Sequence, residues 1–340
     1  MMSKNKKSSV GGQALIEGVM MRGVEKAAMA VRVPNGTIDV EEWALKKPSV
    51  VSKIPIVRGI VNFVSSLAMG YSCLSKSAEK AGLEEETNEN PSKFEKFLED
   101  KLGDKLMGIV VVLGVFLGVI GAVVLFMLLP SFIVKGIDYF IPIGGFKALA
   151  EGVIKIIVFV CYLALVAKMK DIRRVFEYHG AEHKTIFCYE AGLPLSVENV
   201  KKQSRFHPRC GTSFLIIILI LSILIFSLPI VPWDNLLLRT GIKLLLLPVV
   251  LGIAYEFIKL AGKYNNWLTR TVSWPGIKVQ NLTTKEPDDS QIEVAIAAVL
   301  PCLSDEERAF YEVKTEVQPE CEVNSNDEET QDEITEPDTI

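Results

Sequence analysis

The chain has 340 residues, of which 49% are hydrophobic and 23% are charged, and its mean hydropathy is +0.30. This mean hydropathy argues against a purely soluble protein, and the apolar content excludes disorder along the whole chain. The six cysteines are widely separated and include no Cys-x-x-Cys pair, which argues against a disulfide scaffold and favours a reducing compartment.

The net charge of −4 is divided unevenly along the chain. Residues 304–340 hold 14 acidic residues against Arg308 and Lys314, so this segment carries −12 and the rest of the chain carries +8. We expect 304–340 to be an acidic, disordered tail without chemistry of its own. A basic, apolar body with such a tail is typical of a membrane protein.

Residues 1–107 are predicted to form a cytoplasmic N-terminal region that contains a β-hairpin. Apolar and polar residues alternate on both sides of an Asn-Gly dipeptide at 35–36, which is the favoured two-residue hairpin turn. The pattern predicts that residues 30–33 pair with residues 37–43. The glycine-rich segment 11–23 lacks the spacing of a phosphate-binding loop and is interpreted as a packing segment.

Apolar stretches predict the membrane topology. Residues 54–74, rich in Ser, Asn and Gly, are expected to form an interfacial amphipathic or re-entrant helix. The alternative is a further span, which would place the N-terminal region on the other side of the membrane. Four later segments are long and apolar enough to cross about 30 Å of hydrocarbon. One of them carries Glu151 and Lys155 at i and i+4, where the two can pair. The predicted fold is a mainly α membrane protein with about four transmembrane helices and small cytoplasmic α/β elements; the expected spans are 108–134, 148–167, 213–232 and 241–260.

The distribution of basic residues predicts the orientation. Residues 168–212 carry nine Lys and Arg residues, against two in 135–147 and two in 231–243. The positive-inside rule therefore places 168–212 in the cytoplasm as a loop, together with both termini and a C-terminal segment at 261–303. This flanking role explains the basic charge, so nucleic acid is not an expected partner. The expected partners are membrane lipids and other membrane proteins.

All three histidines of the chain lie in the basic segment 168–212. His179 and His183 are spaced i and i+4, which places both imidazoles on one face of a helix. His207 and Cys210 add an imidazole and a thiol just before the third predicted span. These ligand types and this spacing favour a tetrahedral site for a divalent metal, with zinc expected. The alternative is two solvated histidines and a third before a proline turn.

Glu182 lies between the first two histidines and completes an H-x-x-E-H string. In the inverzincin metalloproteases, the glutamate of this string is the general base. A protease of that class is not favoured, because those enzymes are large and soluble and cysteine is foreign to their ligand set. We therefore expect Glu182 to be a catalytic base in a different kind of metal-dependent enzyme.

Three other charged residues are candidates at the same site. Glu256 lies in the fourth predicted span near its cytoplasmic end, where an acid is costly. It is expected to be a metal ligand, an outer partner of a ligand or a proton carrier, and the alternative is an i, i+3 pair with Lys259. Arg205 and Arg209 either anchor the basic segment at the membrane or contact a lipid phosphate.

Several long motifs in this sequence resemble the YqhQ-like bacterial membrane proteins. They are segments 11–22, 178–184, 207–212 and 254–256, and the resemblance covers about residues 11–303. It implies a multi-pass protein of the bacterial inner membrane. It also implies a metal-dependent enzyme, because members of the family are described as predicted metal-dependent enzymes. The positions that match its polar motifs are His179, Glu182, His183, His207 and Cys210.

These patterns predict a metal-dependent hydrolase that acts on a membrane-associated substrate, either lipid or peptide. The alternative is a non-catalytic factor for membrane assembly, biogenesis or transport with a structural metal. A closed set of three histidines and one cysteine favours the structural role, whereas three ligands with an open position favour catalysis. A transporter that uses Glu256 as an ion carrier is less favoured, because other charges within the spans are few and no internal repeat is visible.

Overall fold

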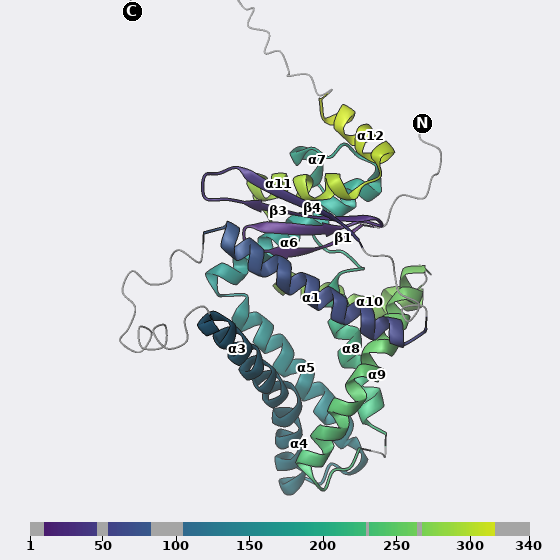
Figure 1. The fold of residues 1–340 in the computed structure, drawn as a ribbon. Coiled ribbons are helices and arrows are strands. Elements are labelled where there is room, and N and C mark those ends of the chain that lie inside the picture. Colours follow the sequence, from purple (N-terminus) through teal and green to yellow (C-terminus); the bar gives the residue numbers. More distant parts are fainter. Residues whose placement is uncertain (1–9, 46–53, 83–104, 229–230, 264–266, 317–340) are drawn as a thin grey trace, which may run out of the picture.

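The computed structural model describes residues 10–45, 54–82, 105–228, 231–263 and 267–316. Figure 1 shows two parts, a layered domain that contains a β-sheet and a group of long helices that extends away from it. We call the first part the sheet domain, formed mainly by residues 10–44, 170–201 and 289–303. We call the second part the apolar helices, formed by residues 105–166 and 211–263.

The sheet domain is built on four antiparallel strands in the order β1-β2-β3-β4. The predicted hairpin corresponds to β3 and β4, with Val31 opposite Asp39. The glycine-rich segment was wrongly interpreted as packing only, because it forms the other two strands. Glycine is depleted in strands and hides their alternation from a sequence reading. The strands are β1 (Gly11–Leu15), β2 (Gly18–Arg22), β3 (Lys26–Arg32) and β4 (Ile38–Ala44).

Helices cover both faces of this sheet (Figure 1). Side chains alternate between the faces of a strand. Val19 and Met21 accordingly pack with residues of α6 (Lys170–Ala191) and α11 (Asp289–Val299), whereas Met20 and Met29 pack against Cys73 of α1 (Val57–Lys80). Asp288 caps the N-terminus of α11, in a capping box with Gln291.

Among the residues that the structure describes, three helices are long and apolar enough to cross a membrane: Val112–Phe140, Gly144–Val166 and Leu236–Leu260. The first begins within α3 (Lys105–Val123) and continues through a π-helical turn (Val124–Leu128) and α4 (Leu129–Phe140). The second comprises a 3-10 turn (Gly144–Phe146) and α5 (Lys147–Val166), and the third lies within α9 (Leu236–Lys263).

The predicted span at 213–232 is shorter than expected. It forms α8 (Gly211–Phe226), which has 16 residues and is therefore about 24 Å long. The chain reaches Pro229 and Pro232 soon after the helix ends, and proline cannot continue a helix. The structure thus has three candidate spans and a short apolar helix in place of the four expected spans.

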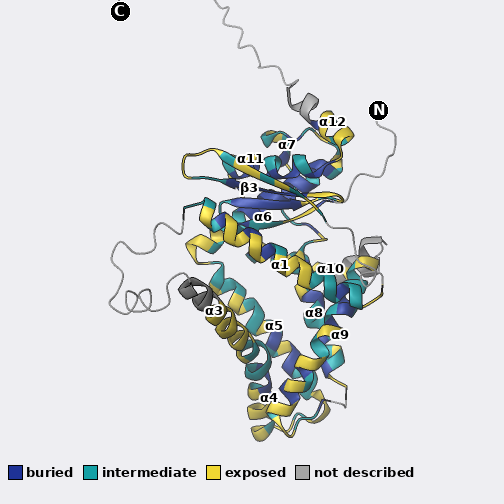
Figure 2. Ribbon diagram, in the orientation of Figure 1, coloured by how far each residue is buried: buried dark blue, intermediate teal, exposed yellow. Residues whose placement is uncertain are grey.

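Helix α1 is amphipathic along its length and is not one of the candidate spans. One face packs on the sheet and on α9 through Gly59, Gly70, Cys73 and Ser77, which are buried. Val64, Leu67, Tyr71 and Leu74 form an exposed apolar stripe on the other face. Figure 1 shows α1 lying between the sheet and the apolar helices, and Figure 2 shows its exposed side in yellow.

Two other segments are more ordered than the sequence indicated. The expected loop at 168–212 is mostly helical, since α6 fills its first half and α7 (Val197–Lys201) follows. The expected disordered tail begins with α12 (Asp305–Glu316), where Tyr311 is buried and donates to the carbonyl oxygen of Tyr189 at 3.0 Å. The face of α12 that carries Tyr311 packs against α6, although the rest of this helix is acidic. Residues 317–340 of this predicted tail lie outside the described residues. The remaining elements are α10 (Trp267–Thr283) and a 3-10 turn (Leu300–Cys302).

Candidate metal centre

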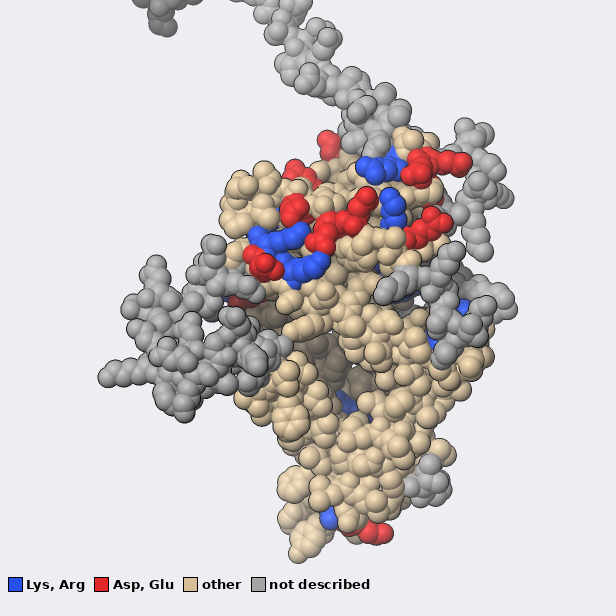
Figure 3. Space-filling model, viewed as in Figure 1, with Lys and Arg blue, Asp and Glu red and all other residues tan. Residues whose placement is uncertain are grey.

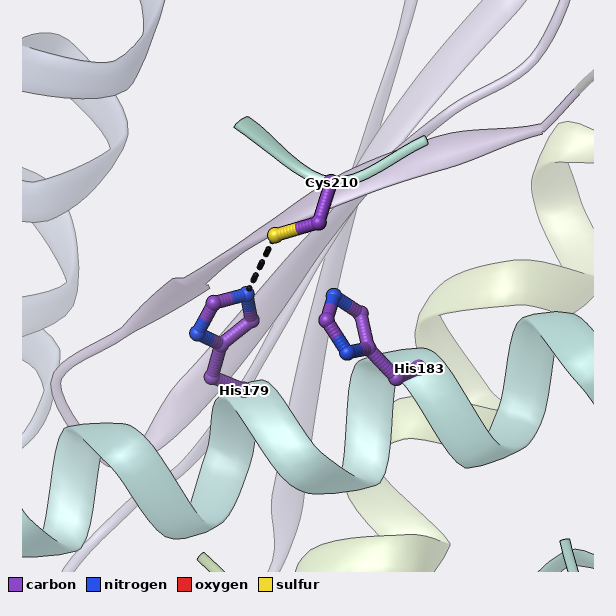
Figure 4. A group of neighbouring side chains, drawn as sticks. All are labelled: His179, His183 and Cys210. Carbon is purple, nitrogen blue, oxygen red and sulfur yellow. Dashed lines mark hydrogen bonds between the residues drawn. The ribbon is translucent and has the colours of Figure 1, made fainter. Parts of the chain in front are cut away.

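Two elements bring three metal-binding side chains together. His179 and His183 project from successive turns of α6, with ring centroids 4.4 Å apart. Cys210 is the residue before the first turn of α8, and its Sγ atom lies 3.2 Å from Nε2 of His179. One ligand atom from each residue lies within 4.8 Å of the other two, so the group could hold a metal ion (Figure 4). We call these three residues the His-His-Cys group.

Backbone carbonyls orient both imidazoles of the group. Nδ1 of His179 lies 2.8 Å from the carbonyl oxygen of Thr283, and Nδ1 of His183 lies 2.6 Å from that of Arg205. A carbonyl oxygen only accepts, so each Nδ1 donates and each Nε2 keeps its lone pair. Metal-binding histidines in proteins are commonly held in this way. Burial also lowers the pKa of His183, which favours the neutral ring that a metal requires.

Gly180 makes this orientation of His179 possible. A Cβ atom at this position would lie 2.0 Å from the carbonyl oxygen of Lys285. The segment after α10 crosses α6 there in backbone contact, and Lys285 donates its N–H to the carbonyl of Phe176 at 2.8 Å. This crossing carries the carbonyl of Thr283 to the imidazole of His179. A glycine between the two motif histidines is therefore part of the site.

Glu182 is buried between α6 and strand β1, outside the His-His-Cys group. It accepts a hydrogen bond from the backbone of Gly12, whose missing side chain makes room for the glutamate Cγ. Burial raises the pKa of Glu182 to about 7, against opposing effects of His179 and of the bond from Gly12. The carboxyl group can therefore exchange a proton near neutral pH.

His207 is next to the group but does not belong to it. Its ring centroid is 5.6 Å from that of His183 and 4.6 Å from the ring of Phe187. Nδ1 of His207 accepts from the N–H of Arg209 at 3.3 Å, and Nε2 lies 3.6 Å from a carboxylate oxygen of Glu190. The structure thus brings three of the four expected ligands together. Ligation by His207 stays a prediction.

The two arginines expected to contact phosphate bind groups of the protein. The guanidinium of Arg205 donates to the carbonyl oxygen of Thr284 at 2.6 Å and lies 3.6 Å from Glu286. Arg209 forms an ion pair with Glu190. The contribution of Arg205 to the site is its main-chain carbonyl, which no sequence motif could indicate.

Comparisons with known proteins support the motif-based resemblance. A family model described as "Protein of unknown function (DUF1385)" matches residues 54–305. The chain belongs to this family. It is 38% identical over 303 residues to "Uncharacterized protein YqhQ" of Bacillus subtilis (strain 168), a match that covers 87% of this chain and 92% of that protein. No solved structure matches. The His-His-Cys group lies within the DUF1385 match.

The structure of this DUF1385 protein does not bring Glu256 into the group. Arg58 binds its carboxylate with two hydrogen bonds, one of them 2.6 Å long from Nε to Oε1, and the N–H of Ile56 adds a third at 3.3 Å. Glu256 therefore joins α9 to the start of α1. A role at the metal centre stays a prediction, and none of these three bonds supports it.

A second polar cluster in this DUF1385 chain was not recognised from sequence. Glu151 is buried among the apolar helices and is bound by Arg239 at 2.6 Å, by Lys243 and by Ser131. The expected partner, Lys155, makes no ion pair with it. The sequence does contain an indication of this cluster. Arg239 and Lys243 are spaced i and i+4 at the start of an apolar helix, which places both cations on one face of that helix. Arg239 and Lys243 are thus both buried among the apolar helices.

Proposed function

We propose that this protein is a metal-dependent hydrolase of the bacterial inner membrane, with zinc bound by the His-His-Cys group. The observation that supports this most directly is the convergence of three ligand atoms within 4.8 Å, with both imidazoles oriented by carbonyl oxygens. Two nitrogens and one sulfur suit zinc, since thiolate and imidazole are its commonest ligands in proteins.

The number of ligands supports a catalytic role over a structural one. Structural zinc sites use four protein ligands, whereas catalytic sites use three and keep one position open. The group here has three members, and His207 is turned to Arg209 and Glu190. When bound, zinc lowers the pKa of a water in its open position to about 7 and so supplies a nucleophile at neutral pH.

The residues around the His-His-Cys group support separate roles in binding the metal and in accepting a proton. Glu182 is one turn from His179 on α6 and is the proposed proton acceptor, because its carboxyl group is buried close to the ligands. Gly12 holds that carboxyl group in place. Burial of Glu182 and His183 also keeps bulk water away from the reaction.

The place of the group in the fold supports a membrane-associated substrate. Cys210 begins α8, an apolar helix, and the two histidines lie on α6 of the sheet domain. The group is therefore at the junction between the sheet domain and the apolar helices. The excess of basic residues in 168–212 supports a cytoplasmic location for this junction and for both termini.

One observation favours the alternative of a structural metal in a non-catalytic assembly or transport factor. Nε2 of His207 is buried without a hydrogen bond to any described group, and its ring is close to that of His183. If His207 also bound the metal, three histidines and one cysteine would form a closed set. Such a set has no open position for a substrate.

The experiment begins with metal analysis of the purified full-length protein. The wild type is expected to carry about one zinc per chain, and His179→Ala and Cys210→Ser to lose it. Cys161→Ser, an exposed cysteine outside the group, is the matched control for the thiol. A wild type that binds no metal under zinc-replete conditions would contradict both roles.

Glu182→Gln then separates the two roles. The wild type in nanodiscs of bacterial lipid extract is incubated with zinc, and mass spectrometry follows the lipids and any membrane peptides. For the hydrolase, Glu182→Gln retains the metal and loses product formation by about 100-fold or more. Equal product formation by the variant, or none by the wild type, would favour the structural role.

A further inference from the structure

One fully buried side chain holds the segment that carries Cys210. Gln280 of α10 is 0% exposed, and its amide group takes part in three hydrogen bonds. Oε1 accepts from the N–H of His207 at 2.8 Å, while Nε2 donates to the carbonyl oxygen of His207 at 2.7 Å and to Oγ of Ser213 at 3.1 Å. His207 and Ser213 lie three residues before and three residues after Cys210. Gln280 therefore fixes both sides of the turn from which the thiol projects.

Hydrogen bonds within this turn connect its two fixed sides to the sulfur atom. The carbonyl oxygen of His207 also accepts from the N–H of Cys210 at 3.4 Å, and that of Cys210 accepts from the N–H of Ser213 at 3.1 Å. The N–H of Thr212 donates to Sγ of Cys210 at 3.4 Å. Because these bonds link consecutive parts of the turn, loss of the amide of Gln280 would let the sulfur move relative to the two imidazoles.

The last turn of α10 also reaches His179. Thr283 is the last residue of α10, and its carbonyl oxygen lies 2.8 Å from Nδ1 of His179. The next residue, Thr284, donates both its N–H and its hydroxyl to the carbonyl oxygen of Gln280, each at 2.8 Å. These two bonds close the turn, so that Gln280 and Thr283 belong to one hydrogen-bonded segment.

Arg205 connects this segment to His183. The guanidinium of Arg205 donates to the carbonyl oxygen of Thr284 at 2.6 Å and to its Oγ1 atom at 3.1 Å. The carbonyl oxygen of Arg205 in turn lies 2.6 Å from Nδ1 of His183. The three ligands come from α6 and from the start of α8, yet each of them is oriented by residues 280–284 or by a residue bound to them.

Close packing of α10 on α8 makes this arrangement possible. Gly276 lies one turn before Gln280, and a Cβ atom on it would be 2.7 Å from Cα of Ser213. Figure 3 shows charged side chains mainly over the sheet domain, whereas Gln280, Thr283 and Thr284 are neutral and buried. The ligands are thus held largely by neutral hydrogen bonds away from water, where such bonds are stronger than at the surface.

We propose that residues 280–284 position all three ligands of the metal centre, and that Gln280 is the positioning residue for Cys210. This role rests on the metal binding proposed above. Gln280 acts through the main chain of His207 and through Ser213 and not on the metal itself. Groups that orient metal ligands in this way commonly contribute about 10–100-fold to metal affinity.

The test measures cobalt(II) binding by the full-length protein after its metal has been removed with a chelator. Cobalt(II) takes the place of zinc, and its absorption spectrum reports both the affinity and the coordination of the ion. Gln280→Met replaces the amide by an apolar group of similar length. This variant should bind cobalt about tenfold or more weakly, and its thiolate-to-cobalt charge-transfer band should change.

Gln291→Met is the matched control for Gln280→Met. Gln291 is also 0% exposed and hydrogen-bonded through its amide, but it belongs to the capping box of α11. Both variants leave buried polar groups without partners and should lower the Tm. Gln291→Met should nevertheless bind cobalt within about twofold of the wild type, with an unchanged spectrum.

Hydrogen exchange of the wild type provides a measurement that needs no variant. When zinc is bound, peptides that cover residues 280–285 should exchange more slowly, although no ligand lies there, because the metal selects the arrangement in which this segment holds the ligands. Peptides from α11 should exchange at the same rate with and without zinc.

The outcomes distinguish this positioning role from metal binding itself. Equal effects of Gln280→Met and Gln291→Met on cobalt binding, or unchanged exchange at 280–285 when zinc binds, would overturn the role of this segment. If Gln280→Met does not fold, the exchange measurement decides. A wild type that binds neither zinc nor cobalt would instead contradict the proposed function.

Discussion

Gly180 and Lys285 meet in direct backbone contact, because a Cβ atom on Gly180 would lie 2.0 Å from the carbonyl oxygen of Lys285. This contact sets the course of the chain after α10. The carbonyl of Thr283 then reaches Nδ1 of His179 at 2.8 Å. The tautomer of a candidate metal ligand thus depends on a glycine next to it and on a segment about a hundred residues later.

Gly180→Ala is expected to damage the metal centre without touching a ligand. The added methyl group must push the 283–285 segment away from α6, at a cost of about 1–3 kcal/mol for overpacking. Loss of the bond from His179 to Thr283 should weaken metal binding by about 10–100-fold. Competition with a zinc chelator measures the affinity, and thermal unfolding measures the stability.

The matched control for Gly180→Ala is Gly211→Ala. Gly211 adjoins Cys210, and a Cβ atom on it would meet nothing within 4 Å. This variant should bind zinc as the wild type does. Equal affinity of the two alanine variants would show that the backbone crossing has no part in the site.

Glu256→Gln is expected to weaken the junction of α1 and α9 and to leave the metal in place. The carboxylate and Arg58 share two hydrogen bonds but are partly exposed, with side-chain exposures of 26% and 22%. The loss in Tm should therefore be small. The zinc content and the Tm of the variant are measured together. A loss of zinc with an unchanged Tm would show that Glu256 acts at the metal centre and not at the junction of α1 and α9.

Glu151→Gln is expected to be among the most damaging substitutions in the apolar helices. The amide leaves Arg239 and Lys243 buried without a counter-charge, and breaking a buried pair in this way costs about 3–5 kcal/mol. Yield of folded protein in mild detergent and Tm are the measurements. Asp138→Asn, at an ion pair with Lys147 near the helix end, is the control and should have a much smaller effect.

Cys302 is expected to resist alkylation until the sheet domain unfolds. Burial raises the pKa of its thiol to about 11, and the Sγ atom lies 3.2 Å from the carbonyl oxygen of Met21. A raised pKa keeps the thiol protonated below that pH, so at pH 8 only roughly one thiol in a thousand is ionised. Iodoacetamide followed by peptide mass spectrometry should label Cys302 in denaturant but not in native buffer. Rapid native labelling would contradict the packing of this cysteine against β2.

Local patterns in the sequence were sufficient for several features of this protein. The Asn-Gly turn identified one hairpin of the sheet, and the i, i+4 spacing of His179 and His183 identified two members of the His-His-Cys group. Long apolar segments identified the three candidate spans, although two of these segments also carry charged residues. Each of these depends on residues a few positions apart, so that backbone periodicity alone carries the information.

Contacts between distant segments could be decided only by the tertiary structure. The carbonyls of Thr283 and Arg205 orient the histidines, yet every residue has a carbonyl and no residue type marks these two. Likewise, the charged partners of Glu151 come from α9, and the charged partner of Glu256 comes from α1. The sequence by itself determined which helices are apolar and which side chains can bind a metal. Only the fold decided which of those side chains meet, because that depends on how separate elements pack.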